Sequence, residues 1–160
     1  MNKAYLLTGG NEGDRFLHMK QARANIEHIC GQLLLVSSLY ETAPWGNKDQ
    51  ADFLNQVLLI ETKFKPEELL RAVLSIEEKG GRKRTTKNAP RTIDIDILFF
   101  NDLVMNEPGL SIPHPRIADR RFVLEPLNEI SPGYIHPVLH KSIHQLLLEC
   151  KDELGVKKIM

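Results

Sequence analysis

Two aspartates, Asp94 and Asp96, lie two residues apart in the segment APRTIDIDILFF (89–100), which otherwise has the composition of a buried strand. Successive side chains of a strand point to opposite faces, so we expect both carboxylates on one face. The other face would hold the apolar side chains that pack against helices: Ile93, Ile95, Ile97 and Phe99. Two uncompensated negative charges about 6 Å apart repel by roughly 3 kcal/mol at an effective dielectric constant of about 20. The pair therefore requires solvent, cationic groups or metal ions beside it.

Bound Mg²⁺ is one way to stabilise the two carboxylates. Mg²⁺ prefers oxygen ligands and commonly binds one or two carboxylates together with substrate phosphates. Two such ions, about 3.5–4 Å apart, would fit carboxylates at this spacing. The alternative is that Asp94 and Asp96 decorate the solvent face of an antiparallel sheet, which is a common arrangement.

Basic residues on either side of the acids favour the first interpretation. No acid lies between Glu78 and Asp94, where the sequence has Lys79, Arg82, Lys83, Arg84, Lys87 and Arg91. A second basic cluster, at 112–122, contains His114, Arg116, Arg120 and Arg121. Arginine binds phosphate oxygens bidentately, so this combination indicates a polyphosphate bound with Mg²⁺. The alternatives are a solvated basic surface and, for His114, a local hydrogen bond.

A flat ring could bind near residues 41–55. Trp45, Phe53 and Asn55 lie close together there, and Phe53 and Asn55 would share a strand face. Aromatic side chains can sandwich a heterocycle, and an amide can both donate to and accept from its edge. Trp45 could equally fill the core and Asn55 could lie at a strand edge. The glycine segment GGNEGD (9–14) has neither the spacing nor the Lys-Ser/Thr pair of a P-loop.

Composition limits the class of protein. The chain has 160 residues, 42% hydrophobic and 26% charged, with Lys+Arg and Asp+Glu at 21 each. The resulting net charge of zero disfavours a general nucleic-acid or membrane-surface binder. No apolar run reaches the length of a membrane span, and MNKAYLLTGG predicts a first strand rather than a signal peptide. Cys30 and Cys150 are predicted to be buried free thiols, which fits a reducing, cytoplasmic setting.

Hydrophobic periodicity predicts an α+β fold. Strands are expected at 4–9, 32–40, 53–62 and 92–100. Helices are expected after the cap residue Asp14 and from Pro66 onward. This βαββαβ order is that of a ferredoxin-like core with a mainly antiparallel sheet. Residues 101–160 would form a C-terminal extension with a helix around 140–151, within a single domain that spans 1–160.

Several motifs, in matching order, resemble the 6-hydroxymethyl-7,8-dihydropterin pyrophosphokinase family of folate biosynthesis. The most specific is KNAPRTIDIDILFF, which fits a Pro-Arg pair followed by D-x-D within a strand. The others are GGNEGD, YETAPWG, DFLNQV, EEKGGRKR and PHPRIADRRFVLEPL. The resemblance extends from about residue 4 to residue 127. It implies a ferredoxin-like enzyme that transfers pyrophosphate from ATP to the pterin hydroxymethyl group and releases AMP.

The resemblance also implies roles for individual residues. Catalytic roles fall to Arg82, Arg91, Asp94 and Asp96, and the two aspartates would hold two Mg²⁺ ions. ATP binding falls to Glu77, Arg84, Ile97, Ser111, Ile112, His114 and Arg120. Pterin binding falls to Thr42, Pro44, Trp45, Phe53, Asn55 and Phe122, with Phe53 and Phe122 stacking on the ring. ATP and the pterin would be the partners of a cytoplasmic monomer, without nucleic acid or membrane.

Two other functions are compatible with parts of the pattern. A non-catalytic RNA-binding module can share the βαββαβ order, but it would stack bases on aromatic side chains of central strands. Here the corresponding strand carries Asp94 and Asp96, which would repel a nucleic-acid backbone. A nuclease or another nucleotidyl transferase would keep the two-metal arrangement and differ only in its products.

Overall fold

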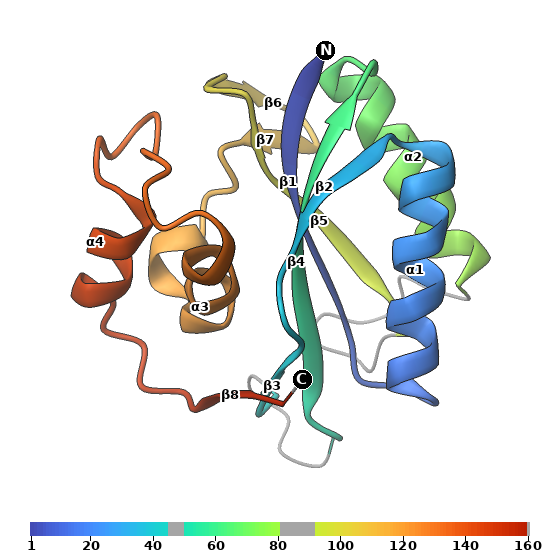
Figure 1. Cartoon of the computed structure of the whole chain (residues 1–160), viewed down its shortest axis with the longest axis horizontal. Helices are drawn as coiled ribbons and strands as arrows, with labels where there is room; N and C mark the ends of the chain where they lie inside the picture. Colours follow the sequence, from blue (N-terminus) through green and yellow to red (C-terminus); the bar gives the residue numbers. More distant parts are fainter. Residues whose placement is uncertain (45–49, 81–91, 160) are drawn as a thin grey trace.

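The computed structural model describes residues 1–44, 50–80 and 92–159, which form an antiparallel sheet with helices on both faces (Figure 1). The first part of the chain forms β1 (Asn2–Gly10), α1 (Arg15–Ile29), β2 (Gln32–Val36), β3 (Tyr40–Thr42), β4 (Phe53–Thr62), α2 (Pro66–Lys79) and β5 (Asp94–Phe100). The second part forms β6 (Met105–Glu107), β7 (Leu110–Ile112), the 3-10 turn η1 (Ile117–Asp119), α3 (Arg121–Ile130), α4 (Ile143–Glu149) and β8 (Val156–Lys158). The predicted mixture of helices with an antiparallel sheet is confirmed. Within the described ranges, no helix is long and apolar enough to cross a membrane.

Strand pairing places the ends of distant segments side by side. The main sheet has the order β5-β1-β4-β3-β8, β2 also pairs with β4, and every pairing is antiparallel.

The predicted strand 32–40 is in fact divided into β2 and β3. Ser37 lies at the break, where its hydroxyl oxygen accepts a hydrogen bond from Val57 N at 2.9 Å. Its own carbonyl accepts one from Gln56 Nε2 at 2.8 Å. These side-chain bonds add to one backbone bond that persists at the break, from Ser37 N to Val57 O at 2.9 Å.

Two apolar cores lie on opposite faces of the sheet. Helices α1 and α2 cover one face, and α3 and α4 cover the other (Figure 1). Helix α1 starts as predicted after Asp14, whose Oδ1 accepts a hydrogen bond from Leu17 N at 3.1 Å. Helix α2 starts at Pro66, which needs no hydrogen-bond partner for its nitrogen at this position.

A bulge in β5 overturns one detail of the predicted strand. Tyr5 of β1 pairs with Phe99, whereas the next residue, Leu6, pairs with Ile97, so the register skips Leu98. Phe99 therefore packs with Leu98 in the core beneath α3 and α4, instead of with Ile93, Ile95 and Ile97 as expected. Extra residues of this kind displace the side chains that follow them.

The C-terminal part contains more structure than expected. Helix α3 was not predicted, and the helix expected around 140–151 is the shorter α4. Ser142 begins α4, since its Oγ accepts a hydrogen bond from Gln145 N at 3.1 Å. Both cysteines are free, as predicted. Cys30 is buried and burial raises its pKa to about 11, whereas Cys150 is only partly buried.

His136, in the loop before α4, should make stability depend on pH. The side chain is 6% exposed, and its Nδ1 accepts hydrogen bonds from Val138 N and Leu139 N, both at 3.1 Å. Burial, with a smaller effect of His140, lowers the pKa of His136 below its ordinary value. The folded state then binds fewer protons than the unfolded state. The contribution of His136 to the free energy of unfolding is therefore fully present at pH values above the unfolded pKa of about 6.5. It decreases as the pH is lowered beyond that value, by at most about 1.4 kcal/mol per pH unit.

A His136→Asn variant tests this prediction, because the asparagine Oδ1 can replace the Nδ1 acceptor without titrating. We expect its free energy of unfolding, measured with urea, to change less than that of wild type between roughly pH 7.5 and pH 5.5. His144→Asn, on α4 and exposed, is the matched control and should keep the wild-type slope. Identical slopes for all three proteins would contradict the assignment.

Candidate active site

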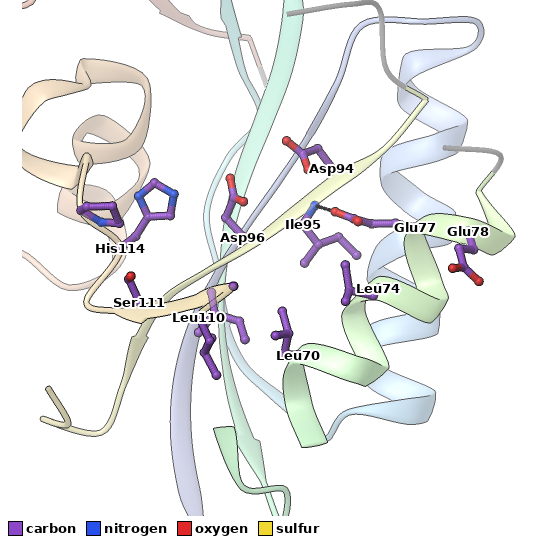
Figure 2. Close-up of a pocket in the computed structure, with 13 residues that line it drawn as sticks. Leu70, Leu74, Glu77, Glu78, Asp94, Ile95, Asp96, Leu110, Ser111 and His114 are labelled. Atoms are coloured by element: carbon purple, nitrogen blue, oxygen red, sulfur yellow. Dashed lines mark hydrogen bonds between the residues drawn. The ribbon is translucent and has the colours of Figure 1, made fainter. Parts of the chain in front are cut away.

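A cavity of about 810 Å³ lies between α2, β5 and the segment that begins with β7 (Figure 2). Its polar wall includes Asp94 and Asp96 from β5, Glu77 and Glu78 from α2, and Ser111 and His114 from β7 and the following loop. Its apolar wall includes Leu70, Leu74, Ile95, Ile97 and Leu110. The apolar residues from α2 and β7 were not predicted as site residues. Leucines at helical spacing signal a core face equally well, so sequence alone could not assign them to a cavity.

The strand register confirms that Asp94 and Asp96 share a face. Asp94 pairs with Gly9 and Asp96 pairs with Leu7, two positions apart on β1. Figure 2 shows both carboxylates on the same side of β5, with His114 across the cavity. Both aspartates are half-buried. They therefore line a recess, and the alternative of an open solvent face is not observed.

Glu77 forms a hydrogen bond with Ile95, the residue between the two aspartates. Its side chain is 2% exposed, and its Oε2 accepts a hydrogen bond from Ile95 N at 2.8 Å (Figure 2). Within the described part of the chain, β5 is the last strand of the sheet on this side, so the Ile95 N–H needs a partner outside the sheet. The carboxylate of α2 thus supplies the missing acceptor and fixes the backbone that carries both acids.

Removing this acceptor should destabilise the protein. We expect Glu77→Ala to lower the free energy of unfolding by about 1–3 kcal/mol, because a buried backbone donor loses its partner. Glu77→Gln keeps an oxygen acceptor and should lose less. Urea unfolding of the three proteins, with hydrogen exchange at the Ile95 amide, measures the effect. Equal losses for both variants would show that the charge of Glu77 matters rather than its acceptor.

His114 lies in the cavity wall with its imidazole held neutral. Burial and the positive charges of Arg120 and Arg116 lower its pKa to about 4, although Asp94 acts in the opposite direction. Its Nδ1 accepts a hydrogen bond from Arg116 N at 3.2 Å, so the ring proton resides on Nε2. The backbone N–H of His114 donates to Leu98 O at 2.9 Å, which attaches this loop to β5 at the bulge. The expected local hydrogen bond is present, and the ring is also part of the cavity.

The other residues expected to bind ATP fall into three groups. Ile97 and Ser111 line the cavity, and Ser111 Oγ donates to Asn106 Oδ1 at 3.0 Å. Ile112 is buried in the apolar core, next to Ser111 of the cavity wall. Arg120 lies against an aromatic ring, with its guanidinium carbon 5.6 Å from the centroid of Phe122. The ATP-binding prediction for Arg84, like the catalytic predictions for Arg82 and Arg91, lies outside the described residues.

Among the residues expected to bind the pterin, Thr42, Phe53 and Asn55 are neighbours on β3 and the first part of β4. Asn55 pairs with Gly9 of β1 and with Tyr40 of β3, and Phe53 pairs with Thr42. Thr42 is 3% exposed, and its Oγ1 has no hydrogen-bond partner among the described residues. Phe53, Pro44 and Phe122 are half-buried, and the prediction for Trp45 lies outside the described residues.

Gly9 connects the two groups of residues and was not predicted as a functional residue. It pairs with Asp94 on one side and with Asn55 on the other, so these three residues form a row across β5, β1 and β4. Neighbouring strands are about 4.8 Å apart, which places the backbones of Asp94 and Asn55 about 10 Å from each other. A side chain between them would obstruct the space above the row. Only the strand register, which is a long-range property, reveals this position.

The donor set at Asp94 and Asp96 fits Mg²⁺ bound together with a phosphate ligand. Within the described ranges, no cluster of three or more His, Cys, Asp or Glu side chains could enclose a metal by itself. Two carboxylates on one face leave the remaining coordination positions to water and to ligand oxygens. Mg²⁺ sites that bind substrate phosphates have this composition.

A family model described as 7,8-dihydro-6-hydroxymethylpterin-pyrophosphokinase (HPPK) matches residues 5–132. The chain belongs to this family. Among curated HPPK relatives, the 2-amino-4-hydroxy-6-hydroxymethyldihydropteridine pyrophosphokinase of Aquifex aeolicus is 39% identical over 91% of this chain and 90% of that protein. The protein of the same name from Bacillus subtilis is 45% identical over 81% of this chain and 78% of that protein.

Some HPPK relatives are much longer than this chain. The folic acid synthesis protein fol1 of Schizosaccharomyces pombe is 44% identical over 90% of this chain, but the match spans only 20% of that protein. The crystal structure of Plasmodium falciparum HPPK-DHPS superposes with a TM-score of 0.76 at 21% identity, over 92% of this chain and 43% of that one. At this identity the likeness establishes the HPPK fold alone.

Proposed function

We propose that this chain is a pyrophosphokinase that transfers pyrophosphate from ATP to 6-hydroxymethyl-7,8-dihydropterin in folate biosynthesis. Membership of the HPPK family supports the reaction. The observation that carries the proposal to this chain is the row formed by Asp94, Gly9 and Asn55. It places a carboxylate pair suited to a phosphate chain about 10 Å from an amide suited to a heterocycle.

The triphosphate would occupy the cavity between α2 and β5. Asp94 and Asp96 would hold two Mg²⁺ ions, whose charge would neutralise the phosphate oxygens while the bond is exchanged. His114 can donate from Nε2 to a phosphate oxygen without carrying a charge. The apolar wall near Leu74 and Ile97 suits the nucleoside, and the volume of about 810 Å³ is in the range of ligand pockets. Further ATP contacts are proposed for Glu77, Arg84, Ser111, Ile112 and Arg120.

The pterin would lie over the β3–β4 end of the row. Thr42 Oγ1, which is buried without a partner among the described residues, and the Asn55 amide would read a ring edge that both donates and accepts hydrogen bonds. Phe53 and Phe122, both half-buried, would stack on the two ring faces. Backbone groups of Pro44 and Trp45 would complete this end of the site.

The chemistry is an in-line displacement. The hydroxyl oxygen of the pterin forms a bond to the β-phosphorus of ATP, and the bond from that phosphorus to the α–β bridging oxygen breaks. AMP leaves with the bridging oxygen, and the hydroxyl proton is released. We assign catalysis mainly to positioning and electrostatic stabilisation, with Arg82 and Arg91 compensating the transferred charge.

We further propose a ferredoxin-like topology within one domain, 1–160. The strand order β5-β1-β4, with β2 and β3 both beside β4, supports this topology. The placement of α1 and α2 on one face also supports it. Residues that follow the βαββαβ core would form an extension with α3, α4 and β8. We also propose that the protein is a monomer in the cytoplasm.

Product analysis tests the proposed reaction. Wild type incubated with Mg²⁺, ATP and 6-hydroxymethyl-7,8-dihydropterin should form AMP and pterin diphosphate in equal amounts, and no AMP should form without the pterin. AMP formation without the pterin would indicate a hydrolase or another transferase instead. A salt-dependent shift of RNA, without pterin-dependent AMP, would indicate the RNA-binding alternative.

A further inference from the structure

A C-terminal strand lies beside the pterin end of the proposed site. Beyond residue 132, where the family match ends, the chain forms α4 and returns to the sheet as β8. Figure 1 shows β8 next to β3, and the pairs are Tyr40–Lys158, Glu41–Lys157 and Thr42–Val156. The same β3 residues pair on their other side with Phe53, Leu54 and Asn55 of β4. The strand β3 is therefore enclosed between β8 and the strand that carries Asn55.

Both ends of the returning segment are anchored. Arg121, at the start of α3, donates from its backbone N to Asp152 Oδ2 at 3.0 Å and from Nε to Asp152 O at 3.0 Å. After β8, Ile159 N donates to Leu39 O at 2.9 Å, and both side chains pack against the core beneath α1 and α2. The segment is thus a fixed part of the fold, although it follows the region matched by the family.

A hydrogen-bond network around Glu129 of α3 joins the same elements. Glu129 Oε1 accepts from Tyr40 OH at 2.7 Å, and Oε2 accepts from Ser38 Oγ at 2.8 Å. Lys158 Nζ of β8 lies 3.9 Å from Glu129 Oε2. Burial acts to raise the pKa of Glu129, but the hydrogen bonds from Tyr40 and Ser38 lower it below its usual value, so the carboxylate stays charged. One ionised group thereby connects α3, β3 and β8.

A strand as short as β3, with three residues, would be weakly held at the edge of a sheet. Pairing on a second side removes that edge and restricts the motion of its backbone. We propose that β8 is a positioning strand for pterin recognition: its pairing with β3 fixes Thr42, and through β3 the Asn55 end of β4, against the ring edge. This inference rests on the proposed function. Restriction before binding raises affinity by lowering the entropy cost of ordering the site.

The ladder offers a matched pair of proline variants. Bonded pairs alternate along an antiparallel ladder, so the bonded pair Ile159–Leu39 predicts a second one at Lys157–Glu41. Lys157→Pro removes a donor that points at β3. Val156→Pro is the control, because its position lies in a non-bonded pair and its N–H points away from β3.

We expect Lys157→Pro to weaken binding of 6-hydroxymethyl-7,8-dihydropterin about tenfold or more, measured by calorimetry with Mg²⁺ and a non-hydrolysable ATP analogue. The affinity for the ATP analogue should change less than about twofold, since the nucleotide cavity is lined by α2, β5 and β7. Val156→Pro should behave as wild type. Hydrogen exchange at Glu41 and Thr42 should rise in Lys157→Pro only.

The outcomes separate this inference from the proposed function. If wild type binds no pterin, the proposed function fails and the inference fails with it. If wild type binds pterin and Lys157→Pro binds it equally well, only the inference is overturned. Equal losses for pterin and nucleotide would reveal a purely structural role and also overturn it. If Lys157→Pro does not fold, Ile159→Ser serves as the second variant, because it removes only the side-chain anchor of the segment. Its loss of affinity for the pterin is then compared with its loss of affinity for the ATP analogue.

Discussion

Asp94→Asn and Asp96→Asn should each lower pyrophosphate transfer about a thousandfold or more at saturating substrates. A metal ion contributes several kcal/mol of charge stabilisation in the transition state, and each ~1.4 kcal/mol corresponds to a factor of ten in rate. Asparagine keeps the shape of the side chain but removes the charge that binds Mg²⁺. Turnover should be measured as pterin-dependent AMP formation over a range of Mg²⁺ concentrations. We expect the Mg²⁺ concentration for half-maximal rate to rise in both variants.

The control for both aspartate variants is Asp102→Asn. Asp102 lies in the exposed turn that follows β5, outside the cavity wall. Its variant should keep the wild-type rate, and circular dichroism should show that all three variants remain folded. A rate loss below tenfold in both Asp94→Asn and Asp96→Asn, in folded protein, would contradict the assignment of these carboxylates to the phosphate site.

The common face of the two aspartates was predictable because it depends on local geometry alone. A strand alternates its side chains with a period of two, and the segment from Ile93 to Ile97 keeps that period. The bulge after Ile97 was not predictable, since no glycine or proline marks it. It arises where Leu98 O accepts a hydrogen bond from His114 N, a contact between segments distant in sequence.

Helix α3 shows how tertiary packing can override a local signal. Pro126 lies inside it, and proline within a helix removes one backbone hydrogen bond and normally ends the helix. The helix persists because Val123, Leu124 and Leu127 are buried against the sheet. These residues have helical spacing, so their periodicity was the signal that could have identified α3.

The arrangement of the site depends on strand pairing, which sequence patterns leave open. Sequence motifs identified Asp94 and Asn55 separately, Asp94 for the phosphate end of the proposed site and Asn55 for its pterin end. Their alignment through Gly9 follows from the registers of β1 with β5 and with β4. The glycine in this row has a steric role that composition alone cannot distinguish from a turn.

Gly9→Ala should impair pterin binding without affecting the nucleotide site. A Cβ at this position would overlap Asn55 Oδ1 and lie 3.2 Å from Leu54 O. Asn55 is 5% exposed and has little room to move, so we expect its amide to relieve the overlap by rotating away from the ring edge that it would read. Overpacking of this kind costs about 1–3 kcal/mol, which predicts a rise of about five- to a hundredfold in the KM for the pterin. Steady-state kinetics with each substrate varied in turn measures this rise, and the KM for ATP should stay close to that of wild type.

Gly133→Ala is the matched control, because a Cβ there would meet no atom within 4 Å. A second comparison isolates the contact itself. In an Asn55→Ala background the overlapping amide is gone, so adding Gly9→Ala should cost much less than it does in wild type. Additive effects of the two substitutions would instead place the damage in the β1 backbone, and an equal rise of both KM values would show that Gly9 supports the whole site. The expected non-additivity, confined to the pterin KM, would show that Gly9 keeps the space between the phosphate end and the pterin end open.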